Sequence, residues 1–118
     1  MAKQYQICIA FPILKGKEAE LKDLAKTLKG PKRKEFDKSE KRLKTTKETW
    51  FIQESPQGSM ALAYFESKID PVKAFEGLAG SKDSFDVWLK DKMREISGID
   101  FNKPSEGPMP EQIMTYGY

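Results

Sequence analysis

The chain has 118 residues, of which 38% are hydrophobic and 33% are charged, and its formal net charge is +3. This length is typical of one domain, so we expect a single domain over residues 1–118 with one core. The chain has no histidine, which excludes Ser-His-Asp and Cys-His catalysis within it and removes the commonest haem and zinc ligand.

No run of 18 apolar residues occurs, so we expect no membrane span, and no signal-peptide pattern precedes the first strand. The single cysteine, Cys8, cannot form an internal disulfide, and a reducing, cytoplasmic setting is therefore expected. The sequence has neither a cofactor motif nor a metal-ligand cluster, so we predict no cofactor and no metal.

The first element is a strand over Tyr5–Leu14, because large residues alternate there with smaller ones. Cys8 lies in the middle of this strand. We expect its side chain to be buried as a small hydrophobic group rather than to act as a reactive thiol.

Lys17–Leu28 places apolar residues at helical spacing and predicts an amphipathic helix that ends or kinks at Gly30-Pro31. The following segment, Lys32–Thr46, is polar, with Phe36 and Leu43 as its only apolar residues. It is interpreted either as a second helix on the surface or as a partly mobile excursion.

Residues 29–47 contain nine lysine or arginine residues and three acidic ones, a local net charge of +6. Nine cations suit phosphate binding of a salt-dependent kind. Phe36 is the only aromatic residue there, however, and base stacking is poorly provided for. Nucleic-acid binding is therefore the weaker alternative, and a solvated helix face is the simpler interpretation.

A hairpin is predicted at the centre of the chain, with strands Thr49–Glu54 and Met60–Glu66 on either side of a Pro/Gly turn. A loop over Pro56–Ser59 places Ser55 opposite Met60, whereas a loop over Pro56–Gly58 would pair Trp50 with Tyr64. We favour the first register because it leaves one face almost wholly apolar.

In that register the two faces of the hairpin differ in polarity. One face holds Phe51, Gln53, Leu62, Tyr64 and Glu66. The other holds Trp50, Ile52, Ala61, Ala63 and Phe65.

The C-terminal half begins with Asp70-Pro71, which predicts an N-cap and a first helical residue. A short helix with Val72, Phe75 and Leu78 on one side follows. A second helix contains the apolar residues Phe85, Trp88, Leu89, Met93 and Ile96.

Ser81 or Ser84 is expected to cap this second helix, and Gly98 to end it. A loop then leads to a last strand over Glu111–Tyr118. That strand is expected to pair in the main sheet or with a second subunit.

The expected order βαββαβ predicts an α+β, ferredoxin-like sandwich: one antiparallel sheet with helices on one face. The second face of the sheet would be exposed and would display Phe51, Leu62 and Tyr64. An exposed apolar face indicates a partner or a ligand. A homodimer in which two sheets pack face to face would cover this face.

The order and spacing of four segments resemble those of a known superfamily. These segments are Ile7–Ile13 running into Lys15-Gly16-Lys17, Trp50-Phe51-Ile52-Gln53 before a Pro-x-Gly turn, Tyr64-Phe65-Glu66, and Phe85-Asp86-x-Trp88 before Gly98-Ile99-Asp100. The chain resembles the dimeric α/β-barrel superfamily, which includes the antibiotic-biosynthesis monooxygenases, and within it a family of small prokaryotic domains of unknown function. The resemblance implies a homodimer with a small pocket between sheet and helices. The haem-degrading branch uses a histidine ligand, which this chain lacks, so haem is not implied.

Tyr64 and Glu66 are the candidate catalytic residues, with Gln53 as a neighbouring ligand-binding residue. Glu66 would act as a base, and Tyr64 and Gln53 would donate hydrogen bonds to a carbonyl or an enolate, because a poorly solvated carboxylate has a raised pKa that suits proton abstraction. The simpler interpretation is a glutamate in water beside a core tyrosine.

Trp50, Trp88 and Asp86 are further candidates for binding a ligand. Core packing is the alternative for the two tryptophans. For Asp86 the alternative is a favourable charge at a helix N-terminus.

These patterns lead to one hypothesis and two alternatives. The hypothesis is a homodimeric α/β-barrel protein that binds a small organic molecule, with cofactor-free oxygenation or isomerisation as its candidate reactions. The alternatives are a module that binds nucleic acid or an acidic partner through residues 29–47, and a non-catalytic scaffold or regulatory subunit. The sequence names no substrate and does not decide whether the protein is an enzyme.

Overall fold

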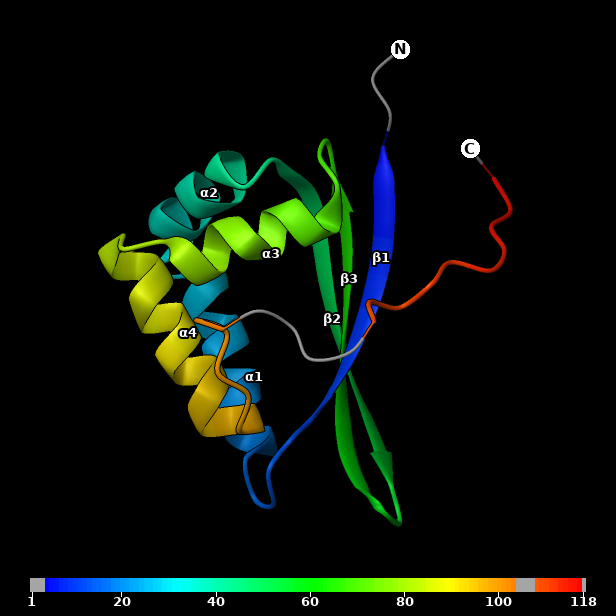
Figure 1. Cartoon of the computed structure of the whole chain (residues 1–118). Coiled ribbons are helices and arrows are strands. Elements are labelled where there is room, and N and C mark those ends of the chain that lie inside the picture. The colour runs from blue at the N-terminus through cyan, green and yellow to red at the C-terminus, as the bar shows by residue number, and fades with distance from the viewer. Residues whose placement is uncertain (1–3, 104–107, 118) are drawn as a thin grey trace.

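The structure is a computed structural model that describes residues 4–103 and 108–117. A three-stranded antiparallel sheet carries four helices on one of its faces (Figure 1). The elements in chain order are β1 (Tyr5–Pro12), α1 (Glu18–Lys29), α2 (Arg33–Arg42), β2 (Thr45–Ser55), β3 (Gly58–Ser67), α3 (Pro71–Gly80) and α4 (Ser84–Ser97). The α+β class is confirmed, and the polar segment after the first helix is the surface helix α2.

The strand order is β1-β3-β2, so β3 is central and β1 and β2 are the edges of the described sheet. The core lies between the sheet and the helices. Its buried members are Phe11, Ile13, Leu21, Leu24, Leu28, Ala61, Ala63, Phe85, Met93 and Ile96. Fully burying a large apolar side chain contributes about 1.5–3 kcal/mol, so this layer is the main source of stability.

The prediction that Cys8 is buried is wrong: Cys8 is exposed. The alternation within β1 was predicted correctly, and the odd-numbered residues face the helices, with Phe11 buried. Because Cys8 is even-numbered, it lies on the face of the sheet that no helix covers.

The hairpin of β2 and β3 forms, but neither predicted register is correct. Ser55 pairs with Gly58, so the turn is the two residues Pro56-Gln57. Gly58 has φ of +122°, a conformation that glycine adopts without steric strain. Gly58 can therefore pair with Ser55 directly after the turn. The favoured register is off by two residues, and because side chains alternate with a period of two, both predicted faces are retained.

A β-bulge interrupts β2 between Thr45 and Lys47. One extra residue exchanges the faces of the strand, so Thr45 lies on the same side as Glu48 and Trp50 despite the difference in parity. All three therefore contact the space between the sheet and the helices.

The caps of the C-terminal helices agree with their predicted positions, with one exception. The Asp70 carboxylate accepts a hydrogen bond from the Val72 backbone N–H at the start of α3. Gly98 ends α4 with φ of +79°. The cap of α4 is Asp83, which accepts from the Phe85 backbone N–H, rather than the predicted Ser81 or Ser84.

The predicted last strand, Glu111–Tyr118, is not formed: residues 111–117 are irregular, and Tyr118 lies outside the described residues. This segment lies near β1 (Figure 1). The Gln112 Nε2 donates a hydrogen bond to the Gln6 Oε1 of β1 over 2.7 Å. Its apolar side chains remain in solvent, with Ile113 88% and Tyr116 98% exposed. Without burial, nothing offsets the entropy lost in ordering a strand.

Candidate functional site

The predicted catalytic pair lies on the open face of the sheet. The Tyr64 Oη donates a hydrogen bond to the Glu66 Oε2 over 2.8 Å. Gln53 does not join them, because it lies opposite Met60 whereas Tyr64 lies opposite Thr49, four residues and thus about 13 Å along β2. The Gln53 amide instead donates to the Glu54 carbonyl.

Trp50, on the opposite face of the sheet, contacts a cavity of about 90 Å³ between the sheet and the helices. Its walls are largely apolar and come from all three strands and from α2, α3 and α4. The lining residues include Ile7, Ile9, Leu43, Phe65, Ala74 and Phe75. Neither Tyr64 nor Glu66 contacts this cavity.

Two glutamates, Glu40 and Glu48, contribute the carboxyl groups in the cavity wall. Glu40 lies in the last turn of α2, and Glu48 is placed by the strand pairing that follows the bulge of β2. Their carboxyl groups are hydrogen-bonded to each other. The Trp50 Nε1 donates a further hydrogen bond to the Glu48 Oε2 over 2.5 Å.

Burial and the neighbouring carboxylates together raise the pKa of Glu40 to about 9. Among these carboxylates, that of Glu48 contributes most. Burial also raises the pKa of Glu48, against the opposing effect of hydrogen bonds from Glu40 and Trp50. Two carboxyl groups this close cannot both ionise readily. At neutral pH Glu40 is therefore a neutral acid, and the Glu48 carboxyl accepts its hydrogen bond.

Such a pair can both donate and accept a proton. The neutral carboxyl of Glu40 is a hydrogen-bond donor at pH 7, and Glu48 is a base in its ionised form. Separated protonation states of two carboxyls are typical of acid–base sites. The arrangement can bind a carbonyl or carboxyl oxygen and can exchange a proton with it.

A second hollow, of about 520 Å³, lies on the outer side of the same carboxyl pair. Glu40, Thr45 and Glu48 belong to the walls of both the hollow and the cavity. Four lysines, Lys41, Lys44, Lys47 and Lys68, line the hollow. The apolar cavity and the basic hollow therefore meet at Glu40 and Glu48.

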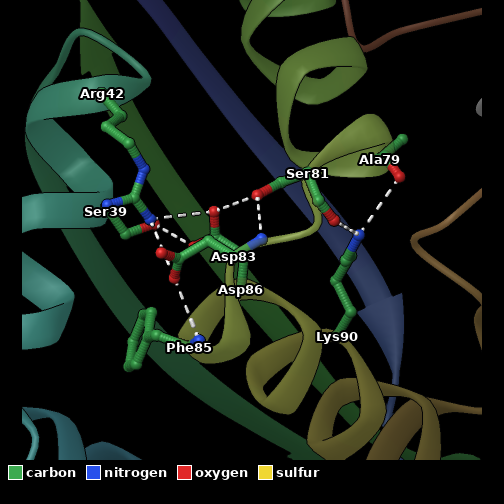
Figure 2. Close-up of polar contacts among 8 residues, drawn as sticks. All are labelled: Ser39, Arg42, Ala79, Ser81, Asp83, Phe85, Asp86 and Lys90. Carbon is green, nitrogen blue, oxygen red and sulfur yellow. Dashed lines mark hydrogen bonds and ion pairs between the residues drawn. The ribbon is translucent and has the colours of Figure 1, made fainter.

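Asp86, a predicted ligand-binding residue, lies behind this site in the first turn of α4 and is 1% exposed. Figure 2 shows its carboxylate among Ser39, Arg42 and Ser81. It accepts hydrogen bonds from the Ser39 Oγ at 2.5 Å, the Ser81 Oγ at 2.6 Å and the Arg42 Nη2 at 3.0 Å. Burial alone would raise its pKa, but these hydrogen bonds outweigh burial and hold the pKa below its usual value.

Lys90, one turn after Asp86, extends the same network. Its side chain is 2% exposed, and its Nζ donates to the carbonyls of Ala79 and Ser81, both at 3.1 Å (Figure 2). A cation at these carbonyls stabilises the C-terminal end of α3. Because Ser39 and Arg42 belong to α2, the network joins α2, α3 and α4 around one edge of the cavity.

Trp88 lies outside the cavity wall. Its ring packs on Phe85, with 5.7 Å between ring centroids, and the Lys32 Nζ lies 4.7 Å from the ring centroid. These contacts favour the packing interpretation of Trp88, with a cation–π contact added.

Glu40 and Glu48 were not among the sequence candidates. The predicted strand began at Thr49 and excluded Glu48, and Glu40 was counted only as one of the acids of the basic segment. The alternation of Glu48, Trp50 and Ile52 was the available signal, because a charged residue in register with apolar ones on the inner face is a candidate buried carboxylate.

No protein-family model, curated protein or solved structure matched the chain. Among residues 4–103 and 108–117, no three acidic or cysteine side chains gather as metal ligands. Within those residues, none of the helices has the length and apolar content that crossing a bilayer requires.

Proposed function

We propose that the protein binds a small organic molecule in the cavity under α3, and that Glu40 and Glu48 exchange a proton with it. The observation that supports this most is a hydrogen-bonded carboxyl pair in the wall of an otherwise apolar cavity. Core packing does not require such a pair, since burying carboxyl groups costs stability that apolar side chains would not.

The reaction that suits this site is proton abstraction next to a carbonyl group. The C–H proton passes to the Glu48 carboxylate, the C–H electrons form the C=C bond of an enolate, and the C=O π electrons move onto the oxygen. The neutral Glu40 carboxyl donates a hydrogen bond to that oxygen. Return of the proton at another atom is an isomerisation. Reaction of the same carbanion with molecular oxygen is the cofactor-free oxygenation that the resemblance suggests.

A ligand screen with matched variants tests this proposal. Short-chain carbonyl compounds and carboxylates are tested for a rise in melting temperature, since a ligand at 100 times its Kd stabilises the folded state by about 2.7 kcal/mol. We expect hits with wild type and with Glu54→Gln, an exposed glutamate on the same strand. Glu48→Gln, which alters the pair, and Ala74→Leu, which fills the cavity, should lose them.

Proton exchange is then measured in D₂O by following deuterium at the carbon next to the carbonyl group of the hit. Wild type and Glu54→Gln should catalyse exchange, and Glu48→Gln should not. A panel without hits, or exchange by Glu48→Gln at the wild-type rate, would contradict the proposal.

We also propose that the protein forms the homodimer of a dimeric α/β barrel through the open face of its sheet. Support comes from apolar side chains that remain in solvent there, with Phe51 56% and Met60 37% exposed. Phe51 pairs directly with Leu62, so the apolar surface crosses both strands of the hairpin. Tyr64 and Glu66 lie on the same face, and their predicted catalytic role would place a second site in this interface.

The basic segment is better suited to a small anion than to a nucleic acid. Three of its cations, Lys41, Lys44 and Lys47, line the hollow beside the carboxyl pair. Nucleic-acid binding remains an alternative prediction. Retention of a labelled oligonucleotide at low salt, undiminished in Glu48→Gln, would favour it. A scaffold role predicts that no compound binds the cavity at all.

A further inference from the structure

The apolar cavity and the basic hollow share the wall formed by Glu40, Thr45 and Glu48. The two spaces therefore adjoin at the carboxyl pair, and a ligand that extends past this pair would occupy both. We propose that the ligand is a short-chain organic anion, with its apolar chain in the cavity and its carboxylate or phosphate in the basic hollow. This inference rests on the proposed function and specifies the class of its ligand.

The size of the cavity limits the apolar part of the ligand. An apolar cavity of about 150 Å³ accommodates benzene, so a cavity of about 90 Å³ holds a smaller apolar group. Aliphatic side chains from β1, the C-cap of α2 and α3 line this space, among them Ile7, Leu43 and Ala74. A chain of about three or four carbon atoms fits this space.

The charges around the hollow select an anion. Lys41 is paired with Asp37 at 3.1 Å. Within the described residues, no salt bridge joins Lys44, Lys47 or Lys68 to a carboxylate. Glu40 and Glu48 carry at most two negative charges, so these three cations exceed the charge of the pair.

The backbone of Lys44 adds an independent observation. Lys44 has φ of +61°, and it is the only described non-glycine residue with a positive φ. It follows the C-cap of α2, a position at which glycine is strongly preferred because it takes this conformation without strain. A lysine in this conformation carries backbone strain, and such strained residues cluster at functional sites.

Isovalerate and isovaleramide form a matched pair of probes, because they share a four-carbon branched chain and differ in charge. Each is titrated into the ¹⁵N-labelled full-length protein, and amide shifts of cavity residues are followed by NMR. We expect isovalerate to bind about fivefold to tenfold more tightly at low salt, and the difference to shrink as salt screens the lysines.

Three variants locate the charge. Lys44→Gly and Lys47→Gln should each weaken isovalerate binding about threefold or more and leave isovaleramide binding unchanged. Lys44→Gly also relieves the strained backbone, so its melting temperature should match or exceed that of wild type. The control Lys22→Gln, an exposed lysine on α1, should bind both compounds as wild type does.

The outcomes separate this inference from the proposed function. Equal binding of the two probes, unaffected by the lysine variants, would contradict the inference that the ligand is an anion. It would leave the cavity site intact. Absence of binding by either probe, together with a neutral hit from the wider screen, would also overturn it. Absence of every hit would remove the proposed function as well.

Discussion

Glu40 keeps its proton at neutral pH because it is partly buried and lies beside the carboxyl group of Glu48. For Glu40 the pKa rises from 4.5 to about 9 on folding. The folded protein therefore binds a proton that the unfolded chain has released over this range of pH. Each pKa unit corresponds to about 1.4 kcal/mol, so the pair makes stability depend on pH in the neutral range.

We predict that the melting temperature falls as the pH rises from about 5 to about 9. The sign follows from the raised pKa: the stabilisation is complete below the pKa of the unfolded carboxyl and is lost as the pH passes the pKa in the folded state. Glu48, whose pKa is also raised, acts in the same direction. In Glu40→Gln, a neutral isostere, the slope should be clearly smaller, as measured by calorimetry.

Glu54→Gln is the control for this measurement, because Glu54 is exposed on the same strand. Its melting curve should follow that of wild type at every pH. An equally steep slope in Glu40→Gln would show that another group is responsible. Asp86 does not interfere, since its pKa is lowered and it titrates at acid pH, below its usual 3.8.

At the scale of single residues, the sequence predicted the faces of the strands better than the site. The inner position of Trp50 and the outer position of Tyr64 both follow from alternation. The meeting of Glu40 with Glu48 depends on how α2 packs on β2, a contact between elements that a periodic pattern does not contain. Cys8 was misplaced because small, buried residues are common, although its parity assigned it to the open face.

Among the helices, α3 depends most on polar contacts. None of its residues is buried. Its C-terminal carbonyl groups are held by Lys90, and the Ser81 hydroxyl that follows it is held by Asp86. Asp86 and Lys90 therefore determine how the cover of the cavity is attached to α2 and α4.

We predict that Asp86→Asn lowers the free energy of unfolding by about 2–4 kcal/mol, since hydrogen bonds to a charged group are worth about 1.5–3 kcal/mol each and do not add fully. Urea denaturation measures this. Asp91→Asn, an exposed site on the same helix, should change stability by less than about 0.5 kcal/mol. Equal effects of the two substitutions would contradict the role of the network.

The order of elements was largely predictable, because each helix and strand has its own periodic pattern and cap. The register of the hairpin was not, since it depends on whether Gly58 belongs to the turn or to the strand. The last strand was predicted from alternation alone. The structure shows that alternation without a covered face does not make a strand: the segment 111–117 finds nothing to bury its apolar side chains against.

For the whole molecule, the open face of the sheet determines the expected oligomeric state. Light scattering at micromolar concentration should give twice the 13.5 kDa of one chain. Phe51→Lys, on this face, should shift the mass to that of one chain, because a dimer interface would have to bury the new charge unpaired.

Val72→Lys is the matched control, since it introduces the same charge at an apolar residue of α3 that is 45% exposed. It should remain dimeric. A wild-type protein that is monomeric at this concentration would contradict the homodimer. It would leave the cavity under α3 unaffected, because that cavity lies on the other face of the sheet.

The hydrogen bond from the Trp50 indole to Glu48 gives the protein an internal optical reporter. Indole fluorescence responds to the charge of the group that its N–H contacts and to the water around the ring. In a Trp88→Phe background, all tryptophan emission comes from this one ring in the cavity wall. The emission wavelength and intensity would then report, without any label, both deprotonation of the carboxyl pair and binding of a ligand in the cavity.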